Sequence, residues 1–115
     1  MSIPTTLLSA VTSTGSGESK TVKDITPDSL VHRGIVSNFS VVVVYATAAP
    51  TVATVKLEGS LDNINWVELG NTIDVSNIVV GFSIVNKPFL YIRGNLSAYT
   101  AGSCTGVTVT CVGVI

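Results

Sequence analysis

Hydrophobic and polar residues alternate with a period of two along much of the chain, and this pattern predicts β-strands. The segment 53–61 places Val55 and Leu57 on one face and Lys56 and Glu58 on the other. The segment 106–114 alternates valine with threonine in the same way. β-Branched residues suit a pleated, half-buried backbone. No stretch repeats apolar residues at a spacing near 3.6 between plausible caps, so we predict no helix.

The alternation and the turn residues predict strands at 5–13, 20–25, 38–48, 53–61, 66–69, 77–85, 89–96 and 106–114. Turn residues recur at intervals of about ten, which is typical of a β-sandwich. The nearly unbroken apolar centre of 38–48 indicates a strand buried on both faces. We therefore predict an all-β fold, an antiparallel β-sandwich of about eight strands with a jelly-roll-like topology. An immunoglobulin-like sandwich is the alternative, disfavoured because the Cys–Trp–Cys spacing is absent.

The 115 residues are enough for one domain. We expect residues 1–17 to form an N-terminal arm or first strand that anchors the protein to a partner, and residues 18–115 to form the sandwich. The apolar residues of the arm are its candidate partner contacts. Tyr99 is a further candidate, because we expect it to be exposed in a loop. These candidate contacts are Ile3, Pro4, Leu7, Leu8 and Tyr99.

Charge is sparse, since only 11% of the residues are charged and the mean hydropathy is +0.58. Either the surface is built from neutral polar residues, or an assembly covers part of the apolar surface; we favour the assembly. No run of Lys or Arg is present, so neither nucleic acid nor an anionic membrane is an expected partner. The longest apolar run is too short for a membrane-spanning helix, and no secretory signal precedes it.

The only tryptophan, Trp66, follows a turn rich in Asp and Asn. Asp62 and Asn63 suit turn positions, because their side chains bond the nearby backbone and tolerate left-handed geometry. Two interpretations of Trp66 are open. It either closes one end of the sandwich as a structural corner, with its indole N–H bonded to a loop carbonyl, or forms an exposed platform that stacks on sugar. We expect Arg93 to pair with Glu58 or Glu68.

Candidate catalytic and metal-binding residues are few. Cys104 and Cys111 would lie about 23 Å apart along one strand, so we predict two free thiols rather than a disulfide. The single histidine, His32, has no partner residues at a recognisable metal-ligand spacing. We find no spacing typical of a nucleophile–base pair or a phosphate-binding loop. We therefore predict a non-enzymatic protein without a metal or cofactor.

The stretch "LEGSLDNINWVELG" (57–70) followed by "KPFLYIRGNLSAYTAGSCTGVTVTCVGV" (87–114) resembles small β-sandwich virion proteins of tailed bacteriophages. The resemblance covers about half of the chain, from Val55 onward. It implies a capsid decoration or cement protein that binds the major capsid protein or another virion protein, stabilises the head and often forms a homotrimer. It implies location in the virion, assembled in the host cytoplasm. A tail or spike accessory protein fits the same resemblance.

The same two phrases also resemble discoidin-like, galactose-binding jelly rolls, which carry a Ser-x-Asp-Gly-x-x-Trp hairpin and an aromatic-x-Arg strand. The chain departs from that pattern at Asn63, where glycine is usual. This second resemblance implies a carbohydrate-binding module as the alternative function. Such a module needs an exposed aromatic side chain with polar neighbours.

Overall fold

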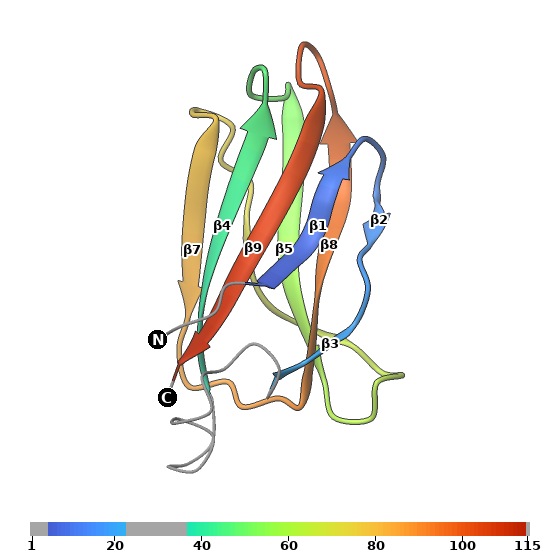
Figure 1. The fold of residues 1–115 in the computed structure, drawn as a ribbon, viewed down its shortest axis with the longest axis vertical. Coiled ribbons are helices and arrows are strands. Elements are labelled where there is room, and N and C mark those ends of the chain that lie inside the picture. Colours follow the sequence, from blue (N-terminus) through green and yellow to red (C-terminus); the bar gives the residue numbers. More distant parts are fainter. Residues whose placement is uncertain (1–4, 23–36, 115) are drawn as a thin grey trace.

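The computed structural model describes residues 5–22 and 37–114, and these residues form an all-β structure (Figure 1). None of them belongs to a helix with the length and apolar character needed to cross a membrane. The strands are β1 (Thr5–Val11), β2 (Gly15–Ser16), β3 (Lys20–Thr21), β4 (Asn38–Ala46), β5 (Val52–Ser60), β6 (Val67–Thr72), β7 (Val79–Ile84), β8 (Tyr91–Thr100) and β9 (Gly106–Val114).

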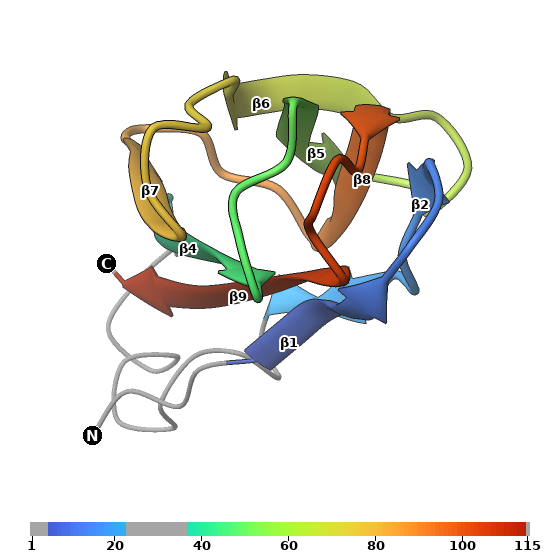
Figure 2. The same cartoon turned by 90° about the horizontal axis from the view of Figure 1, so that it is seen from above.

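The strands form two antiparallel sheets, seen end on in Figure 2. One sheet has the order β1-β9-β4-β7 and the other β2-β8-β5-β6, with β3 also paired to β8. Because β2 and β3 pair with the same strand, they act as one interrupted strand. Counted in this way, eight strands follow the orders 1-8-3-6 and 2-7-4-5. This order is that of a jelly roll, which confirms the predicted fold class.

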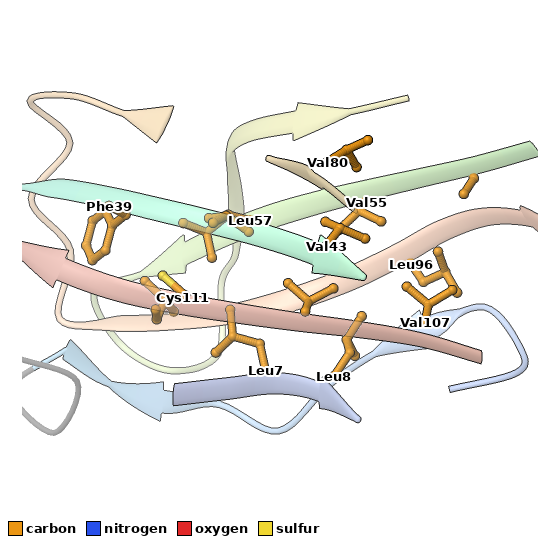
Figure 3. Packing of buried hydrophobic residues seen from close by; sticks show 14 of the residues in the cluster. Leu7, Leu8, Phe39, Val43, Val55, Leu57, Val80, Leu96, Val107 and Cys111 are labelled. Atoms are coloured by element: carbon orange, nitrogen blue, oxygen red, sulfur yellow. The ribbon is translucent and has the colours of Figure 1, made fainter. Parts of the chain in front are cut away.

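The core lies between the two sheets. Val43 and Val107 of the first sheet and Val55 and Leu96 of the second are fully buried. Figure 3 shows side chains of β4 and β9 pointing toward those of β5 and β8. The buried residues alternate with outward-facing ones along the central strands β4 and β5, as a sandwich requires. Apolar burial between the sheets is therefore the main source of stability.

The prediction that the segment 38–48 is buried on both faces is wrong. Along β4 buried and exposed residues alternate strictly. Val41 and Val43 point inward, whereas Val42 and Val44 are 44% and 41% exposed. An antiparallel sandwich covers only one face of each sheet, so a continuous apolar run leaves every second valine outside. The outward valines therefore lie on the solvent-exposed surface of the first sheet.

The N-terminal segment joins the two sheets at one edge (Figure 2). β1 pairs with β9 of the first sheet, and β2 pairs with β8 of the second. Residues 15–16, which lie between two of the predicted strands, thus form a short strand. The Gly17 N–H donates to the Gly94 carbonyl over 2.8 Å, and a Cβ on Gly17 would meet the Leu7 carbonyl oxygen. Glycine is therefore required where the crossing chain passes over β1.

Candidate interaction surfaces

The outer face of the first sheet carries valine, threonine and serine in rows that run across the strands. Val44 of β4 lies opposite Val79 of β7 and Thr108 of β9. In the next row Val42 lies opposite Thr110, which in turn pairs with Thr6 of β1. These side chains point away from the core, and Val79 is 54% exposed. The rows therefore form one continuous surface across all four strands.

We call this surface the neutral face. Its residues on β4 and β7 are Ser40, Val42, Val44, Ala46, Val79 and Ser83. Its residues on β1 and β9 are Thr6, Thr108, Thr110 and Val112. None of these side chains ionises, and the Thr108 hydroxyl accepts a hydrogen bond from the Ala10 N–H. A partner that covers the neutral face therefore has no charge to desolvate.

The outer face of the second sheet has the opposite character. Arg93 pairs with Glu58, with 2.8 Å between Nε and Oε1, and Lys56 pairs with Glu68 over 3.3 Å. Asn95 donates a further hydrogen bond to Glu58. The expected pairing of Arg93 with Glu58 or Glu68 is thus confirmed for Glu58. We call this surface, made by Lys56, Glu58, Glu68, Arg93 and Asn95, the charged face.

Trp66 lies against the charged face, where its ring contacts Arg93. The return strand begins one residue later than expected, at Val67. The Arg93 guanidinium carbon lies 4.3 Å from the centroid of the Trp66 ring, and the indole is half-buried. Arg93 thus bridges Glu58 and Trp66 by an ion pair and a cation–π contact. This cation holds the ring against the sheet surface, and Trp66 is not among the partly buried residues that pack against the core.

Asp62 organises the turn between β5 and β6. Its Oδ1 accepts hydrogen bonds from the backbone N–H groups of Ile64 and Asn65 and from the Ser60 hydroxyl, at 2.8–2.9 Å. The N–H groups of Asn65 and Ile64 hold the pKa of the Asp62 carboxyl well below its usual range. Asn63 has a φ of 62°, the left-handed geometry that asparagine tolerates. Both residues lie in the turn where the sequence placed them.

Tyr99 is not the exposed loop residue that the sequence suggested. It lies within β8, where its backbone pairs with Ala53 of β5, and its ring packs against the core. Its hydroxyl oxygen is buried and has no hydrogen-bond partner in the described part of the chain. The neighbouring Cys104 thiol, together with burial, raises the pKa of Tyr99 to about 12. Tyr99 therefore presents no hydroxyl to a partner.

Of the apolar residues expected on an anchoring arm, the structure buries two, and the other two are not described. Leu7 and Leu8 are each only 4% exposed and belong to the core. Their burial follows from the pairing of β1 with β9, which turns both side chains between the sheets. Both are therefore unavailable to a partner in this fold. Ile3 and Pro4 lie outside the described residues.

A recess of about 340 Å³ lies between β1 and residues 13–18. Its walls include Ser9, Ser13, Thr14 and Ser16, and Glu18 is its only acidic residue.

Cys104 and Cys111 are free thiols, as predicted, and both are buried. Burial raises the pKa of the Cys111 thiol to about 12. Among residues 5–22 and 37–114, no three His, Cys, Asp or Glu side chains gather closely enough to hold a metal ion. His32 lies outside those ranges.

The neutral face was not predicted from the sequence. Its signal was present, because the outward positions of 38–46 and 106–114 alternate with the buried ones and include no charged residue. The apolar run was instead assigned to burial on both faces. The order of the strands in the sheet must be known before the outward valines and threonines can be seen to form one surface.

Comparison with known proteins identifies no relative of this chain. No protein-family model matches the chain, and neither a curated protein nor a solved structure shows significant similarity to it.

Proposed function

We propose that the chain is a non-enzymatic structural protein of a tailed-bacteriophage virion, a capsid decoration protein that binds the capsid lattice and stabilises the head. The observation that carries this proposal is the amount of apolar surface that a single copy leaves uncovered. Besides Val42, Val44 and Val79, the exposed large side chains include Leu61, Ile64, Ile73, Ile78, Val85 and Leu90. Exposed apolar surface on this scale is typical of a protein that functions in an assembly.

The exposed loop residues suit contact with a lattice. Leu61 and Ile64 belong to the turn between β5 and β6, and Val85 and Leu90 to the connection between β7 and β8. Both connections lie at the lower end of the molecule in Figure 1. Apolar tips at one end of a rigid sandwich can insert into the joint between two capsid subunits. Repetition over the lattice multiplies the effect of each small contact.

The fold is compatible with this function without defining it. Jelly rolls occur both in viral capsid domains and in lectin domains, so the topology alone does not distinguish these two classes of protein. The resemblance of the 57–70 and 87–114 segments to phage virion proteins favours the first class. It also implies a homotrimer as the lattice-bound form.

A carbohydrate-binding module is the alternative, and the aromatic side chains argue against it. A sugar platform requires an aromatic face open to solvent. Arg93 stacks on the Trp66 ring, and Tyr99 packs against the core. Neither residue therefore supplies the platform that the alternative requires. A tail or spike accessory role relies on the same apolar contacts as head decoration and differs only in the partner.

Co-sedimentation with capsids tests the proposal. Purified chain is mixed with empty, expanded heads of the phage or prophage whose genome encodes it, and with tails from the same source. We expect saturable binding to heads at a fixed ratio to the major capsid protein. Replacing Leu61 and Ile64 by Asp should weaken this binding, whereas replacing the equally exposed Ile73 should not. Binding to tails alone would support the accessory role, and binding to neither would overturn the proposal.

A further inference from the structure

We propose that the neutral face packs against the same face of a second copy of this chain, so that the protein dimerises through the outer surface of its β1-β9-β4-β7 sheet. The inference goes beyond the proposed function, because it concerns contacts between copies and holds whether or not the chain binds a capsid. It names the surface that joins the copies.

The contrast between the two outer faces is the first argument. The charged face carries Lys56, Glu58, Glu68 and Arg93, held in ion pairs on the surface of the second sheet. The neutral face carries no ionisable side chain on any of its four strands. A sheet that faces water normally alternates apolar residues with polar or charged ones. One outer face carries charged side chains and the other carries none. This difference indicates that the uncharged face is covered in the working assembly.

The flat and uncharged character of the neutral face also limits which kind of surface can cover it. A flat, uncharged sheet face is matched by another flat, uncharged sheet face, because a charged partner would lose hydration without gaining an opposite charge. Among the described residues, the only extended surface of that kind is the neutral face itself. Two copies can stack it as sheets do within a sandwich, about 10 Å apart and rotated by about 30°. The contact is then self-complementary.

The third argument is the area available. The four strands contain six to nine residues each. With strands about 4.8 Å apart and a rise of about 3.3 Å per residue, they span a face of roughly 500 Å². Two such faces bury on the order of 1,000 Å² in total, which reaches the lower limit for a specific interface. The side chains at its centre are Val42 and Val44, whose β-branched chains lose little rotamer freedom on packing.

A pair of matched substitutions tests the inference. Val42→Lys places a charge at the centre of the neutral face, where the valine is 44% exposed. Val67→Lys places the same charge on β6 of the second sheet, where the valine is 52% exposed. Both positions are open to solvent in one copy, so both variants should fold, and far-UV circular dichroism checks this. Native mass is measured by size exclusion with light scattering at about 100 µM chain, above the micromolar Kd that a small interface gives.

We expect the unmodified chain and Val67→Lys to run at twice the chain mass of 11.9 kDa, and Val42→Lys to run at one chain mass. A native mass of one chain for the unmodified protein would overturn the inference. A native mass unchanged by Val42→Lys would overturn it as well. The capsid co-sedimentation separates the two proposals, because a monomer that still binds heads keeps the function, and an oligomer that binds none keeps the interface.

Discussion

Leu7 of β1 packs directly on Gly94 of β8, so that a Cβ added to Gly94 would lie 3.2 Å from the Leu7 Cβ. The two residues come from opposite sheets and from distant parts of the chain. Their contact fixes the first strand across the open edge of the jelly roll. The N-terminal strand is thus part of the sandwich, and residues 5–17 cannot leave it without exposing core.

Truncation of Leu7 should therefore destabilise the whole domain. Leu7→Ala removes a buried side chain from between the sheets, and we expect a loss of about 2–4 kcal/mol in the free energy of unfolding. Thr6→Ala, on the outer face of the same strand, is the control and should change stability by less than about 0.5 kcal/mol. Urea denaturation followed by circular dichroism measures both. Equal stabilities of the two variants would show that β1 is a detachable arm.

Loss of Arg93 should uncover Trp66. Because Trp66 is the only tryptophan, its fluorescence reports this contact alone. Arg93→Ala removes the cation 4.3 Å from the ring and the ion pair to Glu58. We expect red-shifted emission and a loss of about 1–2 kcal/mol. Lys56→Ala removes the neighbouring ion pair with Glu68 and leaves Arg93 in place, so its emission should match that of the unmodified chain; a red shift there would contradict the assignment.

The turn between β5 and β6 should depend on the Asp62 carboxylate. Asp62→Ala removes the acceptor for the N–H groups of Ile64 and Asn65 and should lower the melting temperature. Asp62→Asn keeps one acceptor oxygen and should lower it less. Because the pKa of Asp62 is lowered in the fold, its stabilisation is present above the usual value of 3.8 and is lost as pH falls below it. Thermal melts from pH 2 to 7 should therefore converge for the three proteins at the acid end.

Alkaline pH should destabilise the fold through buried neutral groups. Burial raises the pKa of Cys111 from 9.0 to about 12, and the Cys104 thiol and burial raise that of Tyr99 from 10.0 to about 12. Raised values favour the neutral forms in the fold, so this stabilisation is complete below pH 9 and is lost as pH rises toward 12. The urea midpoint should fall across that window. Cys111→Ala should remove the part of the fall between pH 9 and 10, and an unchanged curve would contradict the prediction.

Period-two alternation was sufficient to predict the strands and the sandwich, because an antiparallel sheet with one wet face imposes that period directly. The Asp62 turn was also accessible, since its chemistry is local. Three other features depend on which strands become neighbours. Trp66 meets Arg93, Leu7 meets Gly94, and Val42 joins Thr110 only after residues 27 to about 90 positions apart are brought together. No local pattern encodes such pairings, so the strand 38–48 was mispredicted as buried on both faces, and the contacts of Trp66 and of Leu7 could not be predicted at all.

The protein composition of purified virions tests most directly whether the chain is a capsid decoration protein. Quantitative mass spectrometry of heads from the encoding phage or prophage measures the number of copies of this chain per copy of the major capsid protein. We expect a fixed and reproducible ratio that survives density-gradient purification and falls when Leu61 and Ile64 are replaced by Asp. Absence of the chain from purified heads and from whole virions would contradict it.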